Sequence, residues 1–227
     1  NSLQDLSHLR KGNLVAKQWI AIVLAAGRGP NDPMAKAYCV SHKCALPVNG
    51  VPMLQRVVDG LRQSRSVAAI SISIEDPAIV LAALAKQDPG ISIMASERSA
   101  PLSAIVAIRK HATYPVLLTT ADHALLTPGM IDYFCGEAGR NGADFSAGLA
   151  RAETVLAAYP QSVRTFFRLG RDRVSGCNLF AIGNENGLRI LEKWQYLEQS
   201  RKKPWRLVAA FGWLALFRFA LRLLSLD

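Results

Sequence analysis

The chain of 227 residues is long enough for one α/β domain with a substantial core. Its 27 lysines and arginines outnumber its 17 aspartates and glutamates, and the net charge of +10 favours anionic partners such as nucleotides, phosphorylated metabolites, nucleic acid or lipid head groups. The densest basic cluster, residues 201–203, is too short to predict nucleic-acid binding. The 4 cysteines lack the Cys-x-x-Cys spacing of a zinc site, so we expect reduced thiols and a cytoplasmic protein.

Residues 1–18 are polar and contain no apolar core of the kind found in signal peptides. Because they also lack an initiator methionine, we interpret them as a tag remnant or as the cut edge of a longer protein. The predicted organisation is an extension at 1–18, one domain at 19–205 and an apolar helix at 206–227.

The first apolar run, Trp19–Leu24, is rich in β-branched residues and apolar on both alternations, which indicates a strand buried on both faces of a parallel sheet. Gly27 and Gly29 follow it. A turn without side chains at the carboxyl end of a central strand lets backbone N–H groups approach an anion, and Lys43 can add a point charge to the same phosphate. A P-loop would need G-x-x-x-x-G-K-[ST], which does not start at either glycine. A dinucleotide fingerprint would need G-x-G-x-x-G, and Asp32 stands where its third glycine would be.

Helices and strands alternate over the next part of the chain in the pattern of a doubly wound sheet. After Pro52, apolar residues recur at helical spacing. We then predict a strand at Val67–Ile74, a helix at Pro77–Lys86, a strand at Ile91–Met94 and a helix at Leu102–His111. Ser99 or Ser103 is a suitable cap for the last of these helices.

A buried strand is predicted at Pro115–Thr120, and Asp122 follows it. Because ligands of open α/β sheets bind where strands end, we expect this carboxylate to face the same crevice as the glycine turn. His123 is a candidate for a substrate contact, although a lone histidine in a loop more often binds a backbone carbonyl.

The second half of the chain has a less regular pattern. We predict a helix at Met130–Glu137 after a Thr127 cap, strands at Asp144–Leu149 and Arg164–Leu169, a hairpin turn at 170–173 and a helix at Gly187–Leu197. The apolar run Leu207–Phe217 is about half of the roughly 20 residues that span a bilayer. Since Arg218 and Arg222 share one helical face, we predict an amphipathic helix that packs on the protein, with a homodimer interface or membrane-surface contact as alternatives.

Two stretches of the chain resemble the signature of the MobA-like NTP transferases, a nucleotidyltransferase family with a GT-A-like Rossmann fold. The first, Leu24-Ala25-Ala26-Gly27-Arg28-Gly29, is similar to the family's L-A-[AG]-G-x-G. The second, KCALPVNGVPML from Lys43 to Leu54, is similar to K-x-L-L-P-V-x-G-x-P-M. Asp122 also matches the aspartate of the family's L-x-x-x-x-D-x-P element, although Ala124 replaces the proline.

The resemblance implies a three-layer, doubly wound, mostly parallel α/β sheet, and transfer of an NMP from an NTP to a phosphorylated small-molecule acceptor with release of pyrophosphate. It implies that Lys43 stabilises charge at the α-phosphate and that Asp122 holds Mg²⁺. The implied nucleotide-binding residues are Leu24, Ala25, Ala26, Gly27, Arg28, Gly29, Arg98 and Ser103, the last two beside the base. The implied acceptor-binding residues are Gly176 and Asn178.

The sequence departs from the family pattern at two places. Pro30 and Asn31 stand where the family has Thr-Arg, so Arg28 or Lys36 would have to replace that arginine at the triphosphate. No D-x-D-type motif that could supply a second metal ligand follows near the carboxyl end. Two other functions therefore stay open: a GT-A glycosyltransferase, for which Asp122 provides only one of the expected carboxylates, and a non-catalytic nucleotide-binding module.

Overall fold

A computed structural model of the chain describes residues 18–27, 32–85 and 89–199. The predicted nucleotide contacts at Arg28 and Gly29 lie outside these residues. So do residues 1–17 of the predicted extension and the apolar segment at 206–227, for which we predict packing on the protein, with a dimer or membrane-surface contact as alternatives. Within the described ranges, no helix is both long enough and apolar enough to cross a bilayer.

The central element is a seven-stranded sheet in the order β5-β4-β1-β6-β9-β7, with β8 paired to β9. Its strands are β1 (Trp19–Leu24), β4 (Val67–Ile74), β5 (Ile91–Ala95), β6 (Val116–Thr120), β7 (Phe145–Arg151), β8 (Phe167–Leu169) and β9 (Asp172–Ile182). β5, β4, β1 and β6 run parallel, whereas β9 is antiparallel to β6 and to β7. The sheet is therefore mostly parallel, as predicted.

β1 lies at the centre of the sheet because both of its faces are apolar. Ala21, Ile22 and Val23 are all 0% exposed. The last residue of β1, Leu24, pairs with Ser73 of β4 on one side and with Thr120 of β6 on the other. This register brings the ends of three parallel strands level, so the residues that follow them share one edge of the sheet.

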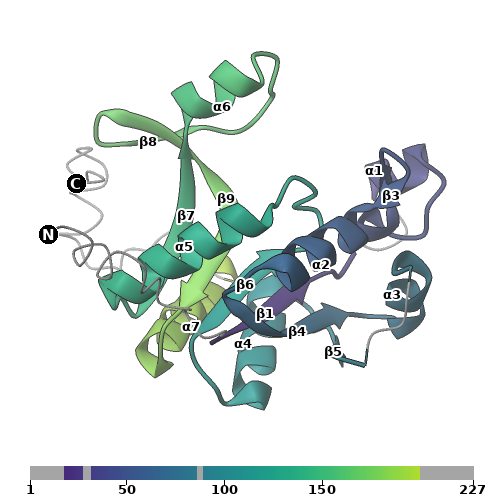
Figure 1. The fold of residues 1–227 in the computed structure, drawn as a ribbon, viewed down its shortest axis with the longest axis horizontal. Coiled ribbons are helices and arrows are strands. Elements are labelled where there is room, and N and C mark those ends of the chain that lie inside the picture. The colour runs from purple at the N-terminus through teal and green to yellow at the C-terminus, as the bar shows by residue number, and fades with distance from the viewer. Residues whose placement is uncertain (1–17, 28–31, 86–88, 200–227) are drawn as a thin grey trace, which may run out of the picture.

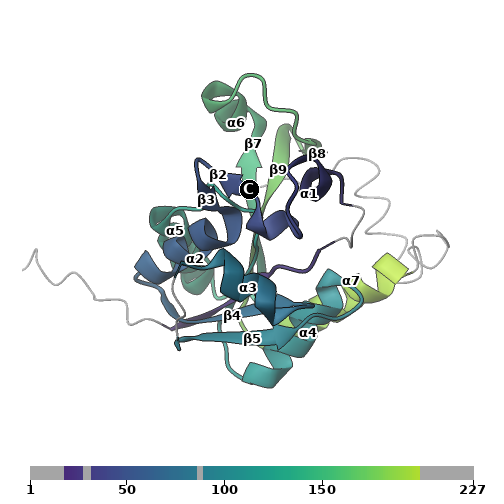
Figure 2. The same ribbon diagram turned by 90° about the vertical axis from the view of Figure 1, so that its right-hand side faces the viewer.

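Helices cover both faces of the sheet, which confirms the three-layer α/β fold (Figure 2). One layer contains α2 (Met53–Gln63), α3 (Pro77–Ala83) and α5 (Pro128–Asn141), and the other contains α4 (Ala100–His111) and α7 (Glu185–Gln199). Each layer has its own core against the sheet. Leu54 and Ile131 belong to the first, and Ile108, Leu188 and Leu191 belong to the second.

Capping residues determine several helix boundaries that the sequence pattern places wrongly. Ser99 caps α4, so this helix begins at Ala100 and not at Leu102. α5 begins at Pro128 behind the Thr127 cap and continues to Asn141, where Gly142 adopts the left-handed conformation that ends helices. α3 is shorter than predicted.

The strand β9 is not predicted beyond the hairpin turn before it, and five short elements also escape the prediction: α1 (Pro33–Ala37), η1 (Lys43–Ala45), β2 (Pro47–Val48), β3 (Val51–Pro52) and α6 (Ala152–Ala158). Asp32 caps α1 by accepting from two backbone N–H groups. Asn49 and Gly50 both have positive φ, 51° and 76°, and join β2 to β3 in the two-residue turn that an Asn-Gly pair favours. Four of these elements lie between β1 and α2 and position Lys43.

A narrow arm extends from the layered core and consists of the end of β7, α6, β8 and the start of β9 (Figure 1). β9 connects the arm to the core. Its first half pairs with β8 in the arm, and its second half pairs with β6 in the core. β8 begins at Phe167 and not at the predicted Arg164.

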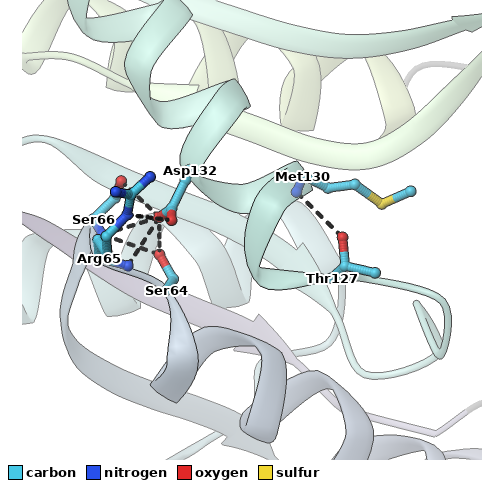
Figure 3. Close-up of polar contacts among 6 residues, drawn as sticks. All are labelled: Ser64, Arg65, Ser66, Thr127, Met130 and Asp132. Carbon is cyan, nitrogen blue, oxygen red and sulfur yellow. Dashed lines mark hydrogen bonds and ion pairs between the residues drawn. The ribbon is translucent and has the colours of Figure 1, made fainter.

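One carboxylate on α5 ties this helix to the turn between α2 and β4 (Figure 3). Asp132 accepts hydrogen bonds from both hydroxyls of Ser64 and Ser66, from the backbone N–H groups of Arg65 and Ser66, and from Arg65 Nε, at 2.6 to 3.4 Å. Burial alone would raise the pKa of Asp132, but these hydrogen bonds outweigh it and hold the pKa below its ordinary value.

We expect Asp132→Ala to lower the free energy of unfolding by about 2–4 kcal/mol, because several donors of the turn lose their acceptor at once. Ser64 and Ser66 are only 1% and 6% exposed, so water cannot readily replace the carboxylate. Urea denaturation measures the change. The control Glu137→Ala on the same helix removes an ion pair whose arginine, Arg140, is 72% exposed, and should cost less than about 1 kcal/mol. Equal losses in the two variants would contradict this account.

Candidate active site

The carboxyl ends of β1, β4 and β6 and the start of α4 open onto a cavity of about 520 Å³. The residues that line it are Leu24, Ala25, Ala26, Gly27, Asp32, Lys43, Cys44, Ser73, Glu97, Arg98, Ser99, Ala100, Ser103, Thr120, Ala121 and Asp122. The chain reverses its direction of progress across the sheet between β1 and β6. Ligands of doubly wound sheets bind at such a switch point, so this cavity is the candidate active site.

The cavity brings together most of the residues that the sequence singles out. The predicted residues on its wall are Leu24, Ala25, Ala26, Gly27, Lys43, Arg98, Ser103 and Asp122. Gly176 and Asn178, which the resemblance assigns to the acceptor, are not among the lining residues and lie on β9 toward the arm. The structure therefore separates the predicted nucleotide contacts from the predicted acceptor contacts.

Lys43 and Asp122, which are far apart in the sequence, meet on the cavity wall. Lys43 Nζ donates to Asp122 Oδ2 at 2.5 Å, and Thr120 Oγ1 donates to Asp122 Oδ1 at 2.6 Å. Lys43 stands at the start of η1, and Asp122 follows β6, so two different elements supply the pair. An ammonium group and a carboxylate are thereby held together where a ligand can reach both, since each side chain is 33% exposed.

The Asp122 carboxyl is held in its ionised form by these contacts. Burial alone would raise its pKa, but the hydrogen bonds from Lys43 and Thr120 outweigh it and lower the pKa below its ordinary value. An ionised oxygen ligand is the type that Mg²⁺ prefers, and Mg²⁺ commonly binds through one or two carboxylates plus substrate phosphates. Asp122 fits that mode, whereas the described residues contain no cluster of three or more His, Cys, Asp or Glu that could hold a metal by itself.

Two backbone amides after β1 are paired within the protein. Gly27 N–H donates to Oε1 and Oε2 of Glu75, at 3.0 and 3.3 Å, and is therefore already paired with a carboxylate. Ala25 N–H donates to the carbonyl of Ser73 at 2.9 Å. Neither amide is free to bind a phosphate in this conformation. The expectation that the Leu24–Gly29 backbone cradles the triphosphate stays a prediction, and residues 28 and 29 of this turn lie outside the described residues.

The wall on the α4 side presents polar groups beside the predicted base contacts. Ser103 Oγ accepts from Glu97 N–H at 2.8 Å, which fixes the loop that carries Arg98 at the start of α4. Ser73, which also lines the cavity, is 1% exposed. Its Oγ has no hydrogen-bond partner within the described part of the chain. A buried hydroxyl without a partner at a cavity wall is available to a polar ligand.

A second group of residues lies on the arm side of Asp122. His123 Nδ1 is buried and has no hydrogen-bond partner among the described residues. Burial lowers the pKa of His123 below its ordinary value and the nearby Arg164 lowers it further, although Asp122 opposes both. Arg164 Nη2 donates to the carbonyl of Gly176 at 2.7 Å. A neutral imidazole and a guanidinium therefore lie near each other at the base of the arm.

Three polar residues of the site escape the sequence analysis: Glu75, His42 and Ser73. The rule that finds Asp122, a polar residue at the end of a parallel strand, would also find Glu75 directly after β4. His42 has no comparable signal, because its position depends on the short elements between β1 and α2. The 4 cysteines are free thiols, and burial, with a smaller effect of Glu75, raises the pKa of Cys44 to about 11.

Comparison with known proteins gives a family match and similar folds. A protein-family description, the MobA-like NTP transferase domain, matches residues 21–175, more than half of the chain. No curated protein matches the sequence significantly. Among solved structures, a hypothetical transferase from Thermus thermophilus is 25% identical, with a TM-score of 0.71 over 92% of this chain and 84% of its own.

Two more distant structures share the fold. A CMP:2-keto-3-deoxy-manno-octonic acid synthetase complexed with CTP is 16% identical, with a TM-score of 0.58 over 87% of each chain. A Mycobacterium tuberculosis protein in complex with manganese is 18% identical, with a TM-score of 0.50 over 77% of this chain and 74% of its own. At these identities, the likeness is evidence for the fold alone.

Proposed function

The chain belongs to the MobA-like NTP transferase family, and on that premise we propose that it transfers an NMP from an NTP to a phosphorylated small-molecule acceptor and releases pyrophosphate. One observation carries the proposal: Lys43 and Asp122 form a 2.5 Å ion pair on the wall of a 520 Å³ cavity at the switch point of the sheet. A cation and an ionised carboxylate at one point of a cavity are the groups that nucleotidyl transfer needs.

The reaction is attack by an acceptor phosphate oxygen on the α-phosphorus of the NTP, with formation of the new P–O bond and departure of pyrophosphate. Such a transfer requires in-line positioning and neutralisation of negative charge more than covalent help from the protein. In our proposal, Lys43 neutralises charge at the α-phosphate. Asp122 would hold Mg²⁺, which supplies further charge neutralisation on the triphosphate when it is bound.

We assign the base and the phosphates to the two ends of the cavity. The turn Leu24–Gly27 and Lys43 lie at the phosphate end. Arg98 and Ser103, with the hydroxyl of Ser73, lie at the α4 end and are proposed to contact the base and ribose. The synthetase that shares this fold was solved with CTP, which makes CTP the first nucleotide to test here.

The acceptor is proposed to approach from the arm side of Asp122. Gly176 and Asn178 lie on that side in β9, and Arg164, which donates to the carbonyl of Gly176, adds a positive charge there. A phosphorylated acceptor complements this charge. The glycosyltransferase alternative is less well supported. It would be expected to carry an acidic D-x-D motif after the strand, whereas Asp122-His123-Ala124 supplies one carboxylate.

Binding of the four common NTPs, each with and without Mg²⁺, tests the first half of the proposal. A ligand that binds only the folded state stabilises it by about 2.7 kcal/mol at a concentration of 100 times its Kd, so the matching NTP should raise the Tm clearly. NADH serves as the control nucleotide and should have no effect. A Tm that no NTP changes would overturn the proposal, whereas binding without pyrophosphate release would favour the non-catalytic module.

A further inference from the structure

The Glu75 carboxylate contacts two segments of the site. It follows β4, and its carboxylate accepts from Gly27 N–H in the turn after β1, at 3.0 and 3.3 Å. The same carboxylate, through Oε1, is 2.9 Å from His42 Nε2 in the loop before η1. Lys43 is the next residue after His42. One carboxylate therefore bridges the glycine turn and the segment that carries the lysine.

The bridge lies behind the cavity wall. Gly27 and Lys43 line the cavity, but neither Glu75 nor His42 is among its lining residues. A Cβ built on Gly27 would come within 2.9 Å of His42 Cδ2 and 3.1 Å of Glu75 Oε1. The bare side of Gly27 thus faces the bridge, and the glycine is required by this packing as well as by any ligand on the other side.

The two side chains are committed to this contact. His42 precedes η1 as its N-cap residue but makes no side-chain capping bond, and its ring is turned to Glu75. The imidazole is 19% exposed and the carboxylate 39% exposed. Burial alone would raise the pKa of Glu75, but its hydrogen bonds with backbone N–H groups and with His42 outweigh burial and lower the pKa. The carboxylate is therefore ionised at neutral pH.

We propose that Glu75 and His42 are positioning residues that hold Gly27 and Lys43 at a fixed separation on the cavity wall, so that one nucleotide lies against both. This inference rests on the proposed nucleotidyl transfer. Neither residue touches the substrate in this arrangement, and they act through Gly27 and Lys43. A misplacement of about 1 Å in a catalytic group can cost about 100-fold in rate, so a brace behind the wall has a measurable effect.

The kinetic test compares Glu75→Ala and His42→Ala with the wild type, using the NTP that the wild type consumes fastest. We expect each variant to lower kcat by about 10- to 100-fold with a smaller change in KM, and the double variant to be no worse than either single variant. His42→Gln keeps a donor that can reach Glu75 and should recover part of the loss. Glu137→Ala, which removes a carboxylate of α5 that does not line the cavity, is the control and should leave kcat unchanged.

Two outcomes would overturn the inference. An NTP affinity that increases in Glu75→Ala would mean that the carboxylate competes with a phosphate for Gly27 N–H. Independent, additive losses in the two single variants would mean that Glu75 and His42 do not act as one unit.

A second measurement does not depend on activity. The amide proton of Gly27, followed by ¹⁵N-NMR in the protein without nucleotide, should shift in Glu75→Gln and His42→Ala but not in Glu137→Ala. If the amide shifts as expected but the wild type releases no pyrophosphate from any NTP, the bridge exists and the proposed function fails. If the wild type is active but kcat and the Gly27 amide are unchanged in the variants, the inference alone fails.

Discussion

We expect Lys43→Ala to lower kcat for pyrophosphate release by about 100- to 1,000-fold, the usual cost of removing one group that stabilises transition-state charge. Lys43 Nζ lies 2.5 Å from the Asp122 carboxylate on the cavity wall, and in the proposed mechanism the variant removes the positive charge at the α-phosphate. KM for the NTP should change less, because the charge that Lys43 neutralises grows as the reaction proceeds. Steady-state kinetics with the preferred NTP measures both constants.

Lys193→Ala is the matched control for this lysine, since Lys193 is exposed on α7 and does not line the cavity. Its kcat should equal that of the wild type. Because Lys43→Ala also leaves Asp122 without its ion-pair partner, the Tm of each variant must be measured alongside. An equal kcat in Lys43→Ala and Lys193→Ala, with both variants folded, would remove Lys43 from the mechanism.

The second large effect is expected from Asp122→Asn, which should reduce Mg²⁺-dependent turnover by about 1,000-fold or more. The amide keeps the size of the side chain and can still accept from Thr120, but it lacks the negative charge and presents a donor toward Lys43. Loss of an ionised oxygen ligand weakens a hard-cation site directly. Turnover measured over a range of Mg²⁺ concentrations should show no recovery at the concentration that saturates the wild type.

Asp59→Asn is the control for this substitution, because Asp59 bonds to Gln55 within α2 and lies outside the cavity lining. The pH dependence provides a further check. Since the pKa of Asp122 is lowered in the folded state, its contribution to stability is present above the unfolded pKa and disappears as the pH falls through the folded pKa. Asp122→Asn should flatten this acid dependence, and an unchanged profile would contradict the ion pair.

The layers of the fold could be predicted from the sequence because the parallel strands carry strong signals. Trp19–Leu24 is apolar on both faces, which predicts a central strand. The alternation of strands and helices up to Thr120 is typical of a doubly wound parallel sheet. The strand-end rule then placed Asp122 in the same crevice as the glycine turn. Buried strands and the helices that cover them can be predicted without knowledge of tertiary contacts, because they follow from local apolar periodicity.

The rest depends on contacts that local sequence does not encode. The partner of Gly27 is Glu75, and the pattern of glycines cannot reveal that a carboxylate from another strand occupies its N–H. The hairpin at Asn49 and Gly50 has a recognisable turn signal, but its strands are only two residues long. In the arm, the register between β8 and β9 follows from tertiary pairing, so the predicted start at Arg164 was wrong.

The central claim is tested most directly by following the α-phosphate of the NTP in the wild type. Each of the four common NTPs is incubated with Mg²⁺ and a sugar phosphate, a polyol phosphate or a molybdopterin-type acceptor, and the products are identified by mass and by pyrophosphate assay. We predict one pyrophosphate for each acceptor that gains an NMP. Inorganic phosphate and an NDP as the products, or no product with any pair although an NTP binds, would contradict nucleotidyl transfer.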